Sequence, residues 1–168
     1  MVIFGIDPGT TILGWGVIRA EGSRMVCLDC GTIRPKAGEL ADKLLTIFDG
    51  LTEKLAIWKP DLVSIEEAFY SDNVRTALVL GHARGVAMLA AKKIGAAIAE
   101  FAPREIKKSL TGNGNAEKDQ VAYMVSMMLG MQGEKHVADI TDALAAAICG
   151  YHHAGSAVAL AATKSKKG

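Results

Sequence analysis

The stretch VIFGIDPGT, residues 2–10, joins an apolar run to an aspartate and a sharp turn. The apolar run predicts a buried strand over residues 2–7, and Pro8-Gly9 ends it. Asp7 then stands at the carboxyl end of the strand, the edge at which open sheets present their ligands. Asp-Pro-Gly is also good turn chemistry, so a functional role and a turn-forming role both remain open for Asp7.

Two further strands follow at short spacing. Their residues predict strands near 12–19 and 24–33, with a turn at Glu21-Gly22-Ser23 between them. Connections this short join antiparallel neighbours. The first three strands are therefore expected to form a meander.

Helices and strands alternate in the middle of the chain. Apolar residues recur at helical spacing over residues 39–58, and Lys59-Pro60 ends that helix. A short buried strand is predicted at 61–66, a helix at 74–94 and a further strand at 96–101. Such alternation is typical of an α/β fold.

The last third is predicted to be mostly helical. Pro103 leads into a polar, glycine-containing stretch over residues 107–115, and a helix follows at 116–129. A final helix begins at Asp139.

Together these elements predict one domain, residues 1–155, with a mixed five-stranded sheet and helices on both faces. Residues 156–168 pass from Ala-rich sequence into lysines, and we expect a disordered basic tail there.

Composition excludes several classes of protein. Of the 168 residues 50% are hydrophobic, enough for one domain with a buried core. The 19 Lys and Arg nearly balance the 18 Asp and Glu, so only a local basic patch could bind a polyanion. Glycine, histidine and serine interrupt the apolar stretch 143–163, which argues against a membrane span. The leaderless start and three cysteines, Cys27, Cys30 and Cys149, predict a cytoplasmic protein.

Further acidic residues stand at the ends of predicted elements. Because successive strand residues face opposite ways, only one of Glu66 and Glu67 can face Asp7. Asp139 and Asp142 are three apart at a helix start, and so lie on one face. Solvation would explain the glutamates, and helix capping the aspartates. A bound divalent cation, with Mg²⁺ the natural choice, explains the positions at both strand ends and at the helix together.

Five segments carry these acids, glycines and basic residues in a defined order. They are Gly5-Ile-Asp7-Pro-Gly-Thr, Ile65-Glu66-Glu67-Ala-Phe69, Ala83-Arg-Gly-Val86, Thr111-Gly-Asn-Gly-Asn-Ala-Glu-Lys118 and Ala138-Asp-Ile-Thr-Asp142-Ala-Leu144. In this order they resemble the RuvC family of bacterial Holliday junction resolvases across nearly the whole chain. The resemblance implies a ribonuclease H-like fold and a homodimer that nicks four-way DNA junctions.

The resemblance also implies roles for the acids. The acidic catalytic cluster of the family falls on Asp7, Glu66, Asp139 and Asp142, which decides between the two glutamates. Such a cluster suits phosphodiester hydrolysis with two Mg²⁺ ions, for which Mn²⁺ is an expected substitute, and gives 5′-phosphate ends. Some relatives carry His at the position of Asp139; His136, one turn earlier, is interpreted as a surface residue or an outer-shell group.

A DNA-facing rim follows from the same resemblance. Lys107 and Lys118 match basic positions near the scissile phosphate. Phe69 matches an aromatic position that contacts DNA near the junction centre, where it would stack on bases. The implied protein partners are RuvA and RuvB, which carry out branch migration.

The predicted helix 74–94 is net basic. Its Arg75 and Arg84 are candidate contacts to phosphate, which would make binding sensitive to salt. Its Gly81 and Gly85 permit the close approach of another helix, either within the chain or across the dimer.

Other functions fit parts of the sequence. A related nuclease that cuts RNA or a hybrid would need the same acids. An actin-like ATPase would share Ile6-Asp7-Pro-Gly-Thr-Thr11 but needs a duplicated domain, for which this chain is too short. A junction-binding protein without activity would not need the complete acidic set.

Overall fold

Five strands form the central sheet of the computed structural model, which describes residues 1–67, 73–133 and 136–165. They are β1 (Val2–Asp7), β2 (Leu13–Glu21), β3 (Arg24–Ile33), β4 (Leu62–Glu66) and β5 (Ala97–Phe101), in the order β3-β2-β1-β4-β5. Strands β1, β2 and β3 pair antiparallel, whereas β4 runs parallel to β1 and β5 parallel to β4. The predicted meander and mixed five-stranded sheet are confirmed.

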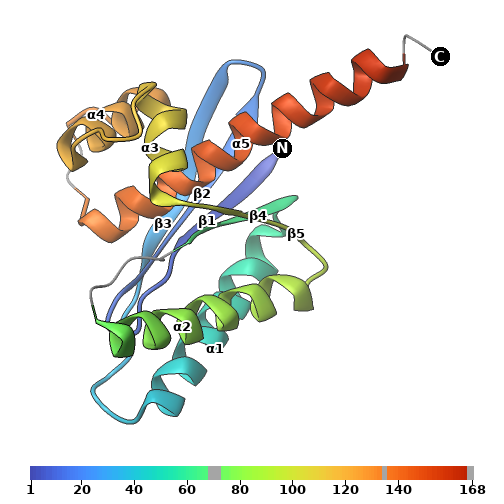
Figure 1. The fold of residues 1–168 in the computed structure, drawn as a ribbon. Coiled ribbons are helices and arrows are strands. Elements are labelled where there is room, and N and C mark those ends of the chain that lie inside the picture. The colour runs from blue at the N-terminus through green and yellow to red at the C-terminus, as the bar shows by residue number, and fades with distance from the viewer. Residues whose placement is uncertain (68–72, 134–135, 166–168) are drawn as a thin grey trace.

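Helices cover both faces of this sheet, as predicted (Figure 1). One face carries α1 (Leu40–Trp58) and α2 (Val74–Lys93), and the other carries α3 (Pro103–Thr111), α4 (Lys118–Leu129) and α5 (Ala138–Ser165). Helix α5 continues through most of segment 156–168, and the predicted division at residue 155 stays a prediction. None of the helices among the described residues combines the length and the apolar character that a membrane span requires.

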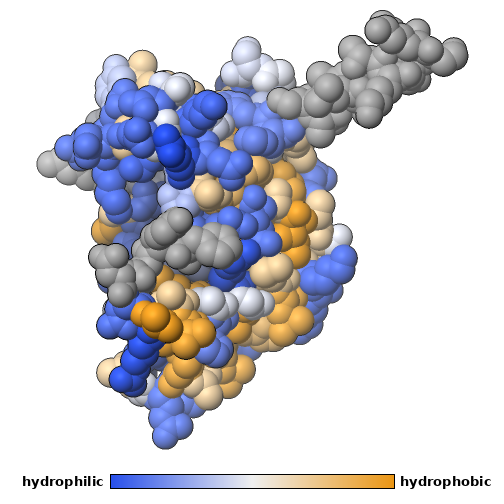
Figure 2. All heavy atoms as spheres, viewed as in Figure 1, coloured by the Kyte–Doolittle hydropathy of each residue, from blue (hydrophilic) through white to orange (hydrophobic). Residues whose placement is uncertain are grey.

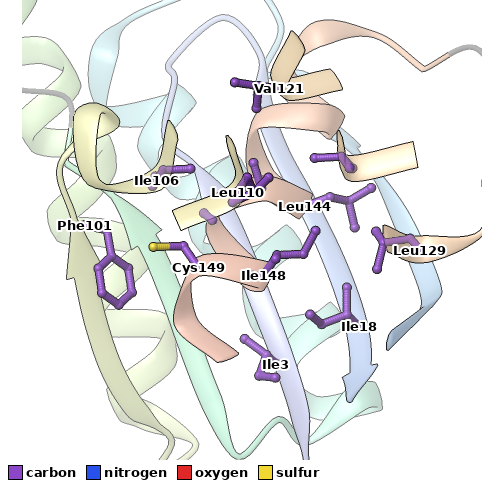
Figure 3. Packing of buried hydrophobic residues seen from close by; sticks show 14 of the residues in the cluster. Ile3, Ile18, Phe101, Ile106, Leu110, Val121, Leu129, Leu144, Ile148 and Cys149 are labelled. Atoms are coloured by element: carbon purple, nitrogen blue, oxygen red, sulfur yellow. The ribbon is translucent and has the colours of Figure 1, made fainter. Parts of the chain in front are cut away.

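Strand alternation divides the core into two apolar layers. In β1, Ile3 faces the layer beneath α5, while Phe4 and Ile6 face the layer shared with α1 and α2. Figure 3 shows Leu144 and Ile148 of α5 in the first layer, on the same side of the sheet as Ile3. All of these side chains are buried, so α5 packs on the sheet as a core element.

Glycines on β1 and β2 let α5 approach the sheet closely. A Cβ added at Gly5 would overlap the Ala143 carbonyl oxygen and lie 2.9 Å from the Ala147 Cβ. A Cβ added at Gly14 would overlap the Asp139 carbonyl oxygen. Only residues without a side chain fit at these positions, and the start of α5 consequently lies directly on the sheet.

Ser64 connects β4 to α5 by a hydrogen bond. Its side chain is fully buried, and its hydroxyl donates to the Ala146 carbonyl oxygen at 2.6 Å. A Cβ added at Gly150 would lie 3.0 Å from the Ser64 Cβ, so helix and strand are close here too. The hydrogen bond satisfies a hydroxyl that would otherwise be costly to bury.

Helix α3, which covers the first part of the predicted polar stretch 107–115, was not predicted from the sequence. Pro103 occupies the first turn, where its missing N–H removes no helical hydrogen bond. The Glu105 carboxylate accepts a backbone N–H at the helix start at 3.0 Å. Ile106 and Leu110, four residues apart, are buried on one face. The other predicted elements agree with the structure to within two residues at each end.

Gly5→Ala is expected to lower the free energy of unfolding by about 1–3 kcal/mol, because the added methyl group must displace α5. Denaturant unfolding followed by circular dichroism measures the change. Gly38→Ala is the matched control, since Gly38 lies outside the helices and strands and its added Cβ comes no nearer than 3.9 Å to the Asp42 carboxylate. Unchanged stability of Gly5→Ala would contradict the close contact between α5 and β1.

Candidate active site

Asp7 and Glu66 end two adjacent parallel strands. Ile6 of β1 pairs with Ile65 of β4, so the next residue of each strand lies at the same edge of the sheet. Ile6 and Ile65 face the layer shared with α1 and α2, and alternation directs the two acids to the opposite face, beneath α5. Parallel pairing thus places the two carboxylates side by side.

The start of α5 brings two more carboxylates to this edge. The Asp139 backbone packs against Gly14 of β2, and Asp142 lines the same pocket as Glu66. The negative charges of Asp142 and Asp139 both raise the pKa of Asp7. The four acids predicted as a cluster therefore lie together, brought there by two strands and one helix.

Burial and mutual repulsion raise the pKa of two of these acids. Burial is the largest cause of the raised pKa of Asp7, about 8, followed by the charges of Glu66, Asp142 and Asp139. The pKa of Glu66 is about 7, raised by burial and then by Asp142, although a hydrogen bond with Asp7 lowers it. Near neutral pH the site therefore retains protons that ordinary carboxyl groups would have lost.

A pocket of about 190 Å³ lies between these acids and α3 and α4. Glu66 and Asp142 line it together with Lys107 and Lys118. The Lys118 Nζ lies 3.5 Å from the Asp142 Oδ2, and the charge of this carboxylate is the main cause of the raised pKa of Lys118. The Lys118 side chain is 76% exposed, so this ion pair contributes little to stability. The two predicted lysines thus flank the acids at one pocket.

Glu67 points to the opposite face of the sheet. Its carboxylate lies 3.5 Å from the guanidinium of Arg84 on α2, which also pairs with Glu100 on β5. Alternation along β4 therefore leaves Glu66 alone of the two glutamates at the pocket. Glu100 was not predicted as part of any site, although alternation along β5 would have placed it on the α2 face.

The remaining predicted site residues differ in their surroundings. Phe69 lies outside the described residues. Arg75 is exposed in the first turn of α2, where the Asn73 side chain accepts its backbone N–H at 2.9 Å. Arg84 is largely buried in its ion pairs. His136 is exposed near the start of α5, and its role stays a prediction.

The donor set of the acidic edge fits a hard cation. Within residues 1–67, 73–133 and 136–165, no group of three or more His, Cys, Asp or Glu side chains is arranged to hold a metal ion. The raised pKa values of Asp7 and Glu66 nevertheless mark an oxygen-rich site in which the nearby lysines do not offset burial and the mutual repulsion of the acids. Mg²⁺ and similar ions prefer such oxygen ligands.

A family model described as Crossover junction endodeoxyribonuclease RuvC matches residues 3–150. The chain belongs to the RuvC family. RuvC from Maricaulis maris is 47% identical over 152 residues, 90% of either chain. RuvC from Oleidesulfovibrio alaskensis is 44% identical over 89% of either chain. The predicted family and the predicted enzyme class, a crossover junction endodeoxyribonuclease, are confirmed.

Solved structures agree with this assignment. Thermus thermophilus RuvC superimposes with a TM-score of 0.87 at 30% identity, covering 94% of this chain and 97% of that one. The same protein in complex with a Holliday junction substrate gives 0.85 at 28% identity, with coverages of 93% and 96%. The yeast mitochondrial Holliday junction resolvase, 14% identical with a TM-score of 0.60, shares the fold. The predicted ribonuclease H-like fold is confirmed, and RuvC membership decides against an actin-like ATPase.

Asp7→Asn is expected to stabilise the metal-free protein at pH 8 by about 1–3 kcal/mol. The pKa of Asp7 rises from 3.8 to about 8 on folding, so between these values the folded protein holds a proton that the unfolded chain has lost. The free energy of unfolding therefore falls as pH rises through this window, and removing the acid should relieve the loss. Denaturant unfolding in a chelator at pH 5 and pH 8 measures the effect.

The gain should be small at pH 5 and large at pH 8. Asp49→Asn, an exposed aspartate on α1, serves as the control and should change stability little at either pH. A gain for Asp7→Asn that is independent of pH would refute the raised pKa.

Proposed function

We propose that this chain is a Mg²⁺-dependent, structure-selective endonuclease that resolves four-way DNA junctions by paired symmetric nicks. The observation that carries the proposal is the meeting of Asp7, Glu66, Asp139 and Asp142 at one sheet edge in a chain of the RuvC family. The activity belongs to homologous recombination and DNA repair, which produce and consume such junctions. The T. thermophilus RuvC complex with a Holliday junction substrate supports the choice of DNA.

The four acids would hold the metal, after their side chains turn toward a common point. Mg²⁺ is expected at two positions per site, with Mn²⁺ as a substitute. When bound, these ions would neutralise charge at the reacting phosphate and supply the nucleophile and leaving-group stabilisation of in-line hydrolysis. Because Asp7 and Glu66 retain protons near neutral pH, cation binding should release protons from the site.

The residues around the acids would bind and orient the phosphodiester. Lys107 and Lys118 line the pocket opposite the carboxylates, where their ammonium groups can bind phosphate oxygens. Ile106 gives the pocket an apolar wall that limits the access of water. Arg75, exposed at the start of α2, would contact the DNA backbone, and Phe69 would stack on bases at the junction centre.

We infer that α2 forms the seam of a homodimer. Leu78 and Leu89 on this helix are each 61% exposed. They line a broad apolar groove together with Gly81 and Gly85, and a Cβ added at either glycine would meet no described atom within 4 Å other than its chain neighbours and the nearby backbone of α2. Figure 2 shows hydrophobic residues gathered at the surface over α2 and its neighbourhood. This open space argues against an intramolecular contact at the two glycines and leaves them for a second copy.

A two-fold dimer matches the substrate. Two equivalent sites related by symmetry can act on the two equivalent strands of a junction. The expected partners are RuvA and RuvB, which would deliver the junction by branch migration, and the expected location is the cytoplasm.

Asp7→Asn is expected to reduce junction cleavage by at least about 10³-fold while leaving junction affinity nearly unchanged, because it removes a metal ligand and no DNA contact. Nicking of an immobile four-way junction is measured with and without Mg²⁺, and affinity by mobility shift in a chelator. A linear duplex and an RNA–DNA hybrid are compared in the same assay. Asp49→Asn should cleave as wild type does.

Two results would overturn the proposed function. Cleavage retained by Asp7→Asn would refute the metal site. Equal cleavage of duplex or hybrid by the wild-type protein would refute junction selectivity and favour a related nuclease.

Leu78→Glu is expected to convert the dimer to a monomer, because it places a charge in the apolar seam on both sides of the two-fold axis. Sedimentation velocity at several protein concentrations measures the shift. Ile57→Glu is the matched control, since Ile57 is also 61% exposed but lies on α1 away from the groove. A Leu78→Glu dimer of unchanged strength would place the seam elsewhere.

A further inference from the structure

A cluster of three charged residues lies on the α2 side of the sheet, directly behind the acidic edge. The Arg84 guanidinium of α2 donates to the Glu100 carboxylate of β5 and lies 3.5 Å from the Glu67 carboxylate. The three side chains are only 23–26% exposed. One cation therefore joins a helix to two neighbouring strands.

Glu67 is held by its backbone as well as its side chain. Its N–H donates to the Phe101 carbonyl oxygen at 2.9 Å, so it continues the pairing of β4 with β5 beyond the last strand residue. Glu66 is the residue immediately before it. Because both the backbone N–H and the carboxylate of Glu67 are held, the peptide that joins the two glutamates cannot rotate freely. This restriction also limits the direction of the Glu66 side chain.

We propose that Arg84 is a positioning residue that acts through Glu67 and Glu100 to aim Glu66 into the pocket. The inference rests on the proposed function, because it concerns the geometry of a residue assigned there to the metal. This role differs from the expectation that Arg84 contacts phosphate. Its guanidinium pairs with two carboxylates of the protein, and such pairing stabilises the structure of the protein itself.

Arginine suits this position better than lysine does. The planar guanidinium presents several N–H donors in a fixed fork and can bind two carboxylates at once. Without it, Glu67 and Glu100 would be left as largely buried like charges at diagonal positions on one face of the β4–β5 pair. Their repulsion would separate the strand ends next to Glu66.

The cluster also connects the site to the proposed seam. Arg84 faces the sheet from α2, while Leu78 and Leu89 of the same helix face outward. A movement of α2 on dimer formation would therefore shift Arg84 and, through its ion pair with Glu67, change the orientation of Glu66. The effect of Arg84 substitutions should appear in the cleavage rate at saturating junction concentration, because Arg84 is not among the described residues that line the pocket.

The experiment compares Arg84→Ala, Arg84→Lys and Glu67→Gln with the wild-type dimer. Arg84→Ala should lower kcat by about 10- to 100-fold, as is usual for residues that orient metal ligands, with junction Kd changed less than about twofold. Arg84→Lys should recover only part of the loss. Glu67→Gln should change kcat in the same direction, and the double variant should lose less than the product of the two effects. Lys92→Ala, an exposed cation on the same helix, is the matched control.

Hydrogen exchange of the Glu67 amide supplies a readout independent of activity. Its protection should fall in metal-free Arg84→Ala while protection in β1 stays unchanged, which would support a local effect at the strand end. If Arg84→Ala fails to fold, the nearly isosteric Glu67→Gln carries the same comparison.

The results that would overturn this inference differ from the result that would overturn the proposed function. An unchanged kcat with a weakened, less salt-dependent junction affinity for Arg84→Ala would overturn the inference and assign Arg84 to DNA. Unchanged kcat and exchange in Glu67→Gln would overturn it as well. Failure of the wild-type protein to cleave junctions would instead overturn the proposed function.

Discussion

The contact between α5 and the glycine-lined face of β1 and β2 is the constraint on which the site depends. Helix α5 supplies Asp139 and Asp142, and the sheet supplies Asp7 and Glu66. These two pairs meet only because Gly5 and Gly14 carry no side chains that would hold the helix away. The same contact also buries the Leu144 layer of the core, so the packing that forms the core also brings the site together.

Assembly of this site opposes stability in the absence of a cation. Raised pKa values at Asp7 and Glu66 mean that the folded protein resists ionisation of groups that ionise freely in the unfolded chain. The apolar packing of α5 must offset this repulsion. Such opposition between stability and activity is found where function needs a strained arrangement of charge.

Much of this arrangement could be predicted from the sequence, for identifiable reasons. Strand-like segments joined by short turns indicated the meander, and carboxylates at element ends indicated the acidic edge. Helix α3 was missed because its charged residues hide the Ile106–Leu110 spacing and because Gly112 follows so soon. The ion pairs of Arg84 could not be predicted from the sequence, since its partners Glu67 and Glu100 are brought to it by tertiary structure. Phe69 depends on family resemblance alone.

Ser64 has a consequence for the accuracy of strand pairing. A slip of β4 by one residue would exchange the faces of Glu66 and Glu67. Each face of the sheet would still receive one carboxylate, so the two glutamates alone do not favour the observed register. Ser64 does favour the observed register of β4 over the slipped one. In the slipped alignment its hydroxyl would leave the Ala146 carbonyl oxygen and enter the apolar layer shared with α1 and α2. The buried Ser64 hydroxyl thereby favours the register of β4 that directs Glu66, and not Glu67, to the nuclease site.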